Sequence, residues 1–276
     1  MDRLLLIDGS NLLFQMYFGM PARIVNAQGE AIHGTLGFVG ALLKMIRMVQ
    51  PDCVGVLFDG EHENPRAALD AGYKANRMEE ERDTPFSQLP DIYRALDHLG
   101  LCRAETVDCE TDDWIAGYAK RYGCEYDIVI ASMDSDFFQL IAPNVRILRY
   151  RGKGSVLCDE TYIREKLAIE PWQYADFKSL TGDAADNIPG VPGVGIKTAA
   201  KLLREFGSLE NLLERCSEII KPSVRAAIAE NAQRIQLNRR LIALEGAREL
   251  PFSPQEMRWE DTGATTVQVL REIGVY

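Results

Sequence analysis

The sequence predicts an α/β protein with a mostly parallel central sheet flanked by helices, followed by a second, helical part. Short apolar runs typical of buried strands alternate with segments of helical periodicity over the first ~150 residues. From residue 160 onward the pattern is helical, apart from a glycine-rich loop. The length of 276 residues allows one large domain or two closely associated ones. We expect the α/β part to span residues 1–180 and the helical part residues 181–276.

Each predicted element depends on its apolar pattern and on the residues that bound it. Three apolar runs end at or just before an aspartate, so we interpret each as a buried strand followed by a turn. Apolar residues at helical spacing, bounded by a proline or a capping residue, predict helices between them. The strands are residues 3–8, 54–59 and 127–132; the helices are residues 35–50, 85–99 and 112–122, the last with Thr111 as its N-cap; residues 145–150 and 154–158 form a hairpin or two separate strands.

Aspartates follow three of the predicted strands. Asp8 and Asp59 end two of them, and Asp134 comes two residues after the third. In open parallel sheets the functional site lies beyond the carboxyl ends of the strands. We therefore expect these three carboxylates to converge at one edge of the sheet.

Further acids are placed so that they join this group. Asp183 and Asp186 are three residues apart and would share one face of a helical turn. Any one of these clusters, taken alone, is equally well explained as a helix cap or an Asp-Gly turn. All the clusters together are better explained by one shared site than by a separate cap or turn for each cluster. That site contains nine acids in five short clusters: Asp8; Asp59; Glu110, Asp112 and Asp113; Asp134 and Asp136; Asp183 and Asp186.

Nine neighbouring carboxylates need compensating positive charge. Hard divalent cations supply it, and an oxygen-only ligand set favours Mg²⁺ or Mn²⁺ over zinc. Only three histidines are present, and no Cys-x-x-Cys pair occurs. Two such ions about 4 Å apart can activate a water and stabilise the leaving oxygen of a phosphodiester. The acids therefore predict metal-assisted phosphoryl transfer to water, with two ions.

A loop that suits an anion follows the last acids. Residues 187–195 (NIPGVPGVG, the glycine-rich loop) precede an apolar run, and residues 187–204 contain three bases and no acid. Glycines let backbone N–H groups approach a ligand closely, and a helix N-terminus favours phosphate. The alternative is a plain connection between two helices.

Residues 61–84 are polar and contain few large apolar side chains. Such a segment is expected to lie exposed above the site. Within it Arg66, Lys74 and Arg77 are candidates for phosphate contacts, and Tyr73 is a candidate for stacking on a base. A solvated charged surface explains the same composition equally well.

The bulk composition sets further limits. The apolar fraction of 46% and the charged fraction of 26% are those of a globular protein, and no run is long enough to span a membrane. The N-terminus lacks the pattern of a secretory signal, so we expect a cytoplasmic location. The net charge of −10 argues against a general nucleic-acid binder unless acids and bases gather at separate sites.

Six motifs together resemble the 5′-nuclease family of flap endonucleases and 5′→3′ exonucleases, including the N-terminal nuclease domain of bacterial DNA polymerase I and its free-standing homologues. The resemblance runs from the first strand to about residue 245. It implies a PIN-like fold, a helical arch at about residues 61–90 and a helix–hairpin–helix-type DNA-binding motif. The motifs, in family order, are LIDGS, VGVLFDG, YKANR, ETDDWIA, SMDSDFFQL and TGDAADNIPGVPGVGIKTA.

The resemblance also implies roles for single residues. Lys74 and Arg77 resemble the basic arch residues that assist catalysis, and Tyr73 resembles the residue that stacks on the substrate. Arg66 is a further candidate for DNA contact. Asp8, Asp59, Glu110, Asp112 and Asp134 resemble ligands of a first metal group, and Asp113, Asp136, Asp183 and Asp186 resemble a second group. The DNA clamp comprises Gly190, Gly193, Gly195, Lys197, Thr198 and Lys201, with a K⁺ ion held by backbone carbonyls.

We therefore expect a monomeric, metal-dependent nuclease acting on duplex DNA with a 5′ single-stranded flap or a 5′ end, in replication and repair. Gln15 and Phe18 stand where the family often has cations, which supports one alternative: a non-catalytic or weakly active homologue that binds DNA junctions. An RNA-directed PIN-like nuclease is a further alternative. Such enzymes usually have fewer acids and lack the glycine-rich clamp.

Overall fold

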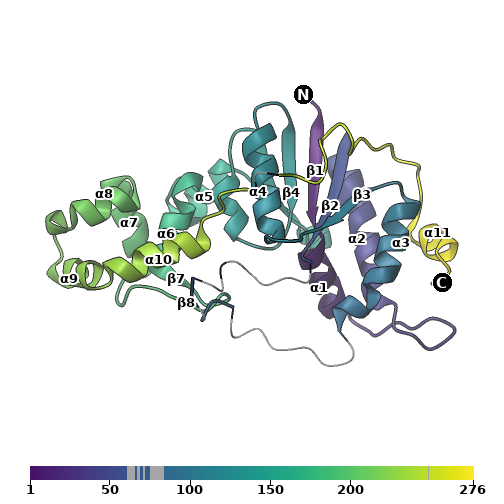
Figure 1. The fold of residues 1–276 in the computed structure, drawn as a ribbon, viewed down its shortest axis with the longest axis horizontal. Coiled ribbons are helices and arrows are strands. Elements are labelled where there is room, and N and C mark those ends of the chain that lie inside the picture. The colour runs from purple at the N-terminus through teal and green to yellow at the C-terminus, as the bar shows by residue number, and fades with distance from the viewer. Residues whose placement is uncertain (61–65, 67–68, 71, 75–83, 248) are drawn as a thin grey trace.

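The computed structural model describes residues 1–60, 66, 69–70, 72–74, 84–247 and 249–276. These residues form a six-stranded sheet covered by helices, with a second group of helices at one end of the molecule (Figure 1). This is the predicted α/β fold with a helical second part. Within the described residues, no helix is long and apolar enough to cross a membrane.

The sheet has the strand order β3–β2–β1–β4–β5–β6, and β6 alone among these strands runs antiparallel to its neighbour. The chain adds β2 and β3 on one side of β1 and then crosses to place β4 on the other side. The space beyond the carboxyl ends of β1 and β4 is therefore a topological switch point, where α/β proteins bind ligands. The strands are β1 (Arg3–Asp8), β2 (Cys53–Phe58), β3 (Cys102–Glu105), β4 (Asp127–Ala131), β5 (Val145–Arg149) and β6 (Val156–Cys158).

Both faces of the sheet are buried. Leu4 and Leu6 of β1 pack in one apolar cluster with helix α4, and Leu5 and Ile7 pack in another with helix α2. Successive side chains of a strand point to opposite faces, so this alternation places a layer of helices on each side. The helices of this part are α1 (Gly9–Gly19), α2 (His33–Val49), α3 (Leu89–His98) and α4 (Thr111–Tyr122), with 3-10 turns at Pro85–Gln88, Asp136–Leu140 and Gly152–Gly154.

The helical part shares a core with the sheet. Phe177, Leu180 and Leu203 belong to the same apolar cluster as Leu4 and Ile130. The two parts are therefore packed against each other, and the acids at the edge of the sheet lie next to the helices. This part contains α5 (Glu160–Leu167), α6 (Tyr174–Thr181), α7 (Ile196–Phe206), α8 (Leu209–Glu214), α9 (Pro222–Glu230) and α10 (Ala232–Ile242), the hairpin of β7 (Gly182–Asp183) and β8 (Ile188–Pro189), and 3-10 turns at Pro171–Gln173 and Cys216–Glu218.

The last residues return to the sheet, so the expectation that residues 181–276 form one helical unit needs correction. The Val54 N–H donates to the Met257 carbonyl (2.9 Å), and the indole N–H of Trp259 donates to the Leu99 carbonyl (2.8 Å). Helix α11 (Thr266–Glu272) ends the chain beside α2 and α3, far from α7–α9 (Figure 1). Apolar side chains such as Val269 drive this return because they complete the core over the sheet.

The strands and helices predicted up to residue 158 are present, with ends shifted by a few residues. Residues 145–158 form the hairpin alternative, since β5 and β6 pair antiparallel. Helix α1 and strand β3 were not predicted. The predicted N-cap of α4 is wrong: Glu110 occupies that position, and Thr111 is the first helical residue.

Candidate active site

Asp8, Asp59 and Asp134 lie beyond the carboxyl ends of three adjacent strands, as predicted. Strands β2, β1 and β4 are neighbours and parallel, which brings the three aspartates to one edge of the sheet. Asp8 caps helix α1 by accepting a hydrogen bond from the Asn11 N–H (3.0 Å), and Ser132 Oγ donates to its other oxygen (2.9 Å). These bonds fix the Asp8 carboxylate at the switch point between β1 and β4.

The turn after β4 holds Asp134 and Asp136. The Asp134 N–H donates to Ser132 Oγ (3.0 Å), and the Asp136 N–H donates to Asp134 Oδ1 (2.8 Å). Arg149, on β5, donates to the Met133 carbonyl (2.9 Å) and so supports the same turn. Asp136 Oδ1 is buried without a hydrogen-bond partner. A buried, unpaired carboxylate oxygen is costly, which suits a site that receives a cation.

The start of helix α4 brings three more acids to this edge. The Thr111 N–H donates to Asp59 Oδ1 (2.9 Å), so the aspartate after β2 satisfies one of the free N–H groups of the helix. This bond connects the second strand to α4. Asp112 lies close enough to Asp8, Asp134 and Glu110 for their charges to raise its pKa, as the predicted grouping implies, whereas Asp113 pairs with Arg66.

Asp183 and Asp186 do not share a helical turn, which corrects the expectation from their spacing. They lie on the hairpin of β7 and β8, where Asp183 is in β7 and Asp186 in the connecting turn. Asp183 Oδ1 accepts from the Ala185 N–H (3.0 Å), a local bond that favours a turn over a helix. Lys178 of α6 forms an ion pair with Asp183 (2.5 Å).

Burial raises the pKa of the central carboxylates. The pKa of Asp8 rises to about 7 and that of Asp136 to about 8, mainly through burial and further through neighbouring acids. Burial and the charge of Asp134 also raise the pKa of Asp112, and burial raises that of Asp134. Among the described residues, no Lys or Arg forms an ion pair with these four acids. Their ionised forms therefore need another source of positive charge.

Oxygen donors at this edge fit a hard divalent cation. In the described part of the chain, however, no three or more His, Cys, Asp or Glu side chains are arranged to hold one ion as they stand. Two of the acids are ion-paired within the protein, Asp183 with Lys178 and Glu110 with two cations. An ion bound through Glu110 or Asp183 would compete with these cations for the carboxylate.

Arg66 and Lys74 both ion-pair with Glu110. Arg66 also binds both carboxylate oxygens of Asp113 (2.7 and 3.1 Å). Burial disfavours the ionised form of Glu110, but the charges of Lys74 and Arg66 outweigh it and lower its pKa. The candidate for DNA contact, Arg66, is therefore turned toward the acids, because two carboxylates compensate its buried charge.

Tyr73 is buried, with 8% of its surface exposed, in a cluster with Ala175, Ile188, Leu241 and Ile242. Its hydroxyl donates to Glu110 (3.4 Å). This differs from the exposed position that base stacking suggested, since apolar neighbours on α6, α10 and the hairpin cover the ring. Arg77 and most of the predicted arch lie outside the described residues.

The glycine-rich loop connects α6 and α7 through the hairpin, and α7 begins at Ile196 after Gly195. Val191 and Val194 anchor it in the core. A Cβ at Gly190 would lie 2.3 Å from the Thr181 carbonyl oxygen, so this glycine allows close packing of two backbone segments. By contrast, Cβ atoms at Gly193 and Gly195 would meet no atom within 4 Å, which leaves that side of the loop open.

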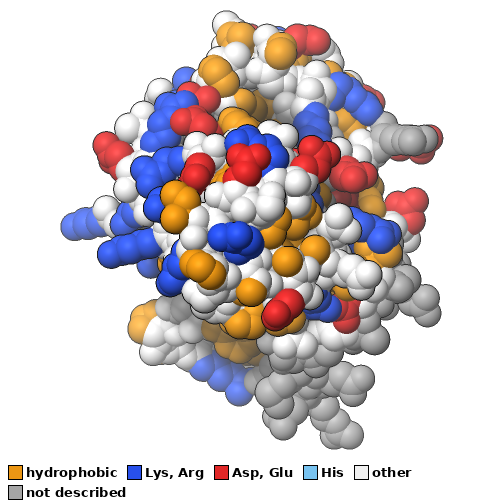
Figure 2. Space-filling model, turned by 90° about the vertical axis from the view of Figure 1, so that its left-hand side faces the viewer, with side chains coloured by type: hydrophobic (Ala, Val, Ile, Leu, Met, Phe, Trp, Pro, Cys, Tyr) orange, Lys and Arg blue, Asp and Glu red, His pale blue; other side chains and the backbone are white. Residues whose placement is uncertain are grey.

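Basic side chains follow the loop on α7. Lys197, Thr198 and Lys201 line a hollow of about 380 Å³ together with Lys221, which precedes α9. Lys and Arg side chains are numerous at this end of the molecule and gather toward one side of it, with Asp and Glu between them (Figure 2). Three lysines and one acid, Glu205, line the hollow, so positive charge exceeds negative charge there.

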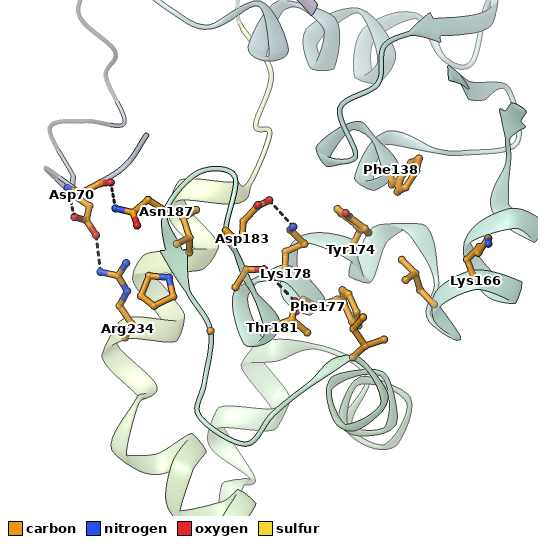
Figure 3. A pocket seen from close by; sticks show the side chains of 18 of the residues that line it. Asp70, Phe138, Lys166, Tyr174, Phe177, Lys178, Thr181, Asp183, Asn187 and Arg234 are labelled. Atoms are coloured by element: carbon orange, nitrogen blue, oxygen red, sulfur yellow. Dashed lines mark hydrogen bonds and ion pairs between the residues drawn. The ribbon is translucent and has the colours of Figure 1, made fainter. Parts of the chain in front are cut away.

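A groove of about 1100 Å³ lies between α5, α6, the hairpin and the residues Asp70 and Gly72 (Figure 3). Asp183 and Lys178 lie on its wall, so it borders the acid cluster. Sequence reasoning missed several residues that support the site, because no spacing rule singles them out and only the fold brings them there: Ser132, Arg149, Lys178 and Arg234.

Comparison with known proteins supports this arrangement. The 5′-3′ exonuclease N-terminal resolvase-like domain matches residues 3–168, and the 5′-3′ exonuclease C-terminal SAM fold matches residues 169–265. A Streptomyces coelicolor protein named 5′-3′ exonuclease is 33% identical over 269 residues, which cover 92% of this chain and 85% of that protein. DNA polymerase I of Thermus thermophilus is 37% identical over 240 residues, but the match spans only 28% of its length.

Solved structures share the fold. Bacteriophage T5 5′-exonuclease with bound zinc ions has a TM-score of 0.73 at 22% identity, covering 88% of this chain and 89% of that one. The catalytic core of Rad2 in complex with DNA substrate has a TM-score of 0.62 at 15% identity, covering 99% and 93%. The matching domains, the relatives and the acids at the switch point lead to one conclusion: the chain belongs to the 5′-3′ exonuclease family.

Proposed function

We propose that this protein is a metal-dependent, structure-specific 5′-nuclease that hydrolyses phosphodiester bonds in 5′-flap or 5′-ended DNA during replication and repair. The observation that carries the proposal is the group of Asp8, Asp112, Asp134 and Asp136. Asp8 is buried and the other three are partly buried; all four lie at the switch point with raised pKa values and, within the described residues, no ion-pair partner. Family membership and the exonuclease name of the Streptomyces coelicolor relative support the same function.

The metals in this proposal are Mg²⁺ or Mn²⁺, and we expect two. The nine acids would hold them, with Asp8, Asp134 and Asp112 central and Asp136, Asp183 and Asp186 on the side of the hairpin. When bound, such ions lower the pKa of a water and neutralise charge on the leaving oxygen. The T5 enzyme, which shares the fold, has been solved with divalent ions, which is consistent with this proposal.

Side chains of the protein would position the scissile phosphate and bind the duplex. Lys74 forms an ion pair with Glu110 within the acid cluster, and in this proposal its ammonium would contact the scissile phosphate there. Arg77 would assist it from the arch. Lys197, Thr198, Lys201 and the open glycines of the loop would bind the duplex backbone, with a K⁺ ion at the loop carbonyls. The protein would act as a monomer.

A non-catalytic junction-binding protein is the competing function, and it depends on Gln15 and Phe18. Gln15 donates its amide N–H to the Tyr150 carbonyl (2.6 Å), so this side chain has a structural bond. Phe18 is 70% exposed at the end of α1. Neither residue removes a carboxylate from the cluster, and so we favour the enzyme.

A labelled 5′-flap duplex separates the two functions. The enzyme should release the flap as a short product when Mg²⁺ is added, and chelator should stop release without abolishing binding. Binding with no product under any divalent ion would instead support the junction-binding protein. The length of the product would show whether the protein cuts at the flap junction or removes nucleotides from the 5′ end.

A further inference from the structure

The backbone before Lys74 is bound to the helical part by Arg234, which lies outside the six motifs, and by Asn187, which lies in the last of them. Arg234 of α10 forms an ion pair with Asp70 (2.6 Å), and the Asn187 amide donates to the Gly72 carbonyl (2.8 Å). Both contacts lie at one end of the groove (Figure 3). A third contact joins the two main chains, because the Lys74 N–H donates to the Asp186 carbonyl (3.1 Å).

These contacts reach Lys74 through a short path. Asp70 uses its other oxygen to accept from the Gly72 N–H (2.8 Å), and its carbonyl accepts from the Tyr73 N–H (3.0 Å). Arg234 thus holds the residue that organises the turn immediately before Lys74. Asn187 holds the same turn from the other side.

The backbone of Lys74 needs such support. Its φ of 54° lies in the left-handed region, which is unfavourable for a residue with a Cβ. A conformation of this kind persists when the surrounding structure determines it. Asn187 also has a positive φ, 58°, but asparagine tolerates this region well.

We propose that Arg234, Asp70 and Asn187 are positioning residues that place the Lys74 ammonium among the acids. They act through the turn that contains Asp70, Gly72, Tyr73 and Lys74, and they do not contact the substrate. The inference depends on the proposed function, since it assigns Lys74 to the nuclease reaction. It also gives the hairpin a second role: the turn that carries Asp186 and Asn187 leads directly into the glycine-rich loop. Contact with the duplex and placement of Lys74 therefore share one structural element.

The test compares each change in two backgrounds, the parent and Lys74→Ala. In the parent, Arg234→Gln should lower kcat on the 5′-flap about 10-fold with little change in KM, because small displacements of a catalytic group are costly. In the Lys74→Ala background the same change should lower kcat less than about twofold, since the residue being positioned is gone. Arg234→Lys, which keeps the charge, should restore part of the activity in the parent.

Asn187→Gly provides an independent variant, because glycine accepts the positive φ while removing the amide. It should show the same dependence on Lys74. Arg240→Gln, an exposed arginine on the same helix, controls for the loss of one positive charge and should leave kcat unchanged. Equal losses in both backgrounds, or a rise in KM alone, would overturn the positioning role and indicate direct DNA contact. A parent that binds but never cleaves the flap would overturn the proposed function together with this inference.

Discussion

Arg66 and Asp113 are joined by two parallel hydrogen bonds, 2.7 and 3.1 Å long, and Arg66 also pairs with Glu110. The Arg66 side chain is only 11% exposed. Arg66→Gln would leave two partly buried carboxylates without this cation, so we expect the free energy of unfolding in chelator to fall by about 3 kcal/mol. Urea unfolding in chelator measures this free energy. The exposed Arg94–Asp91 pair is the control, and Arg94→Gln should have little effect. If Arg66→Gln leaves the free energy of unfolding unchanged but weakens DNA binding, then Arg66 contacts the DNA and does not stabilise the fold.

The buried acids make stability depend on pH when metal is absent. Burial raises the pKa of Asp8 to about 7 and that of Asp136 to about 8, from an ordinary value of 3.8. The folded state therefore binds these protons more tightly than the unfolded state, and stability is lost as the pH rises through this window. We expect the free energy of unfolding in chelator to fall between about pH 5 and about pH 8.

Asp136→Asn removes one of these ionisations. The variant should be more stable than the parent at about pH 8 by about 1.4 kcal/mol or more, the equivalent of one pKa unit, and similar at about pH 5. Urea unfolding at both pH values in chelator gives the comparison. A parent that gains stability over the same range would show that the acids are ionised and compensated within the protein.

Glycines of the loop have two different roles, and alanine substitutions should separate them. At Gly190 a Cβ would collide with the Thr181 carbonyl, so Gly190→Ala should destabilise the protein by about 1–3 kcal/mol. At Gly195 the φ is −88° and a Cβ meets nothing within 4 Å, so Gly195→Ala should change stability by less than about 0.5 kcal/mol. Thermal unfolding measures both. Equal effects would contradict these roles, and weaker duplex binding by Gly195→Ala alone would place the open side of the loop against DNA.

Salt should weaken DNA binding steeply, although the net charge is −10. If Lys197 and Lys201 each contact a phosphate, replacing both by glutamine should reduce the slope of log K against log salt by about 2. Lys44, exposed on α2, is the control and should leave the slope unchanged. Fluorescence anisotropy on a duplex gives the slopes. An unchanged slope in the double variant would place the duplex elsewhere on the surface.

The sequence was sufficient to place the acids of the sheet, because a general rule connects strand order to location. Parallel strands end at one edge, so Asp8, Asp59 and Asp134 could be grouped without coordinates. No comparable rule connects the spacing of Asp183 and Asp186 to one local structure. Three residues apart is compatible with a helix or a turn, and the bond from the Ala185 N–H to Asp183 decides for the turn.

Long-range packing explains what the sequence did not reveal. Tyr73 lies in a polar segment, yet Ile188 and Leu241, distant in sequence, cover its ring. Trp259 returns to the carbonyl of Leu99, 160 residues earlier. Lys178 and Arg234 belong to helices whose patterns gave no reason to connect them with the site. Each of these features depends on a partner that only the folded chain brings near.

In our account cleavage depends above all on the carboxylates of the acid cluster. The most direct test is whether the double variant Asp134→Ala/Asp136→Ala cleaves a labelled 5′-flap. Both residues lie in the turn after β4, whereas Lys197 and Lys201 lie on α7. With Mg²⁺ present, this variant should bind the flap duplex as the parent does and release no product. Turnover equal to that of the parent would contradict the assignment of these carboxylates to the metal site.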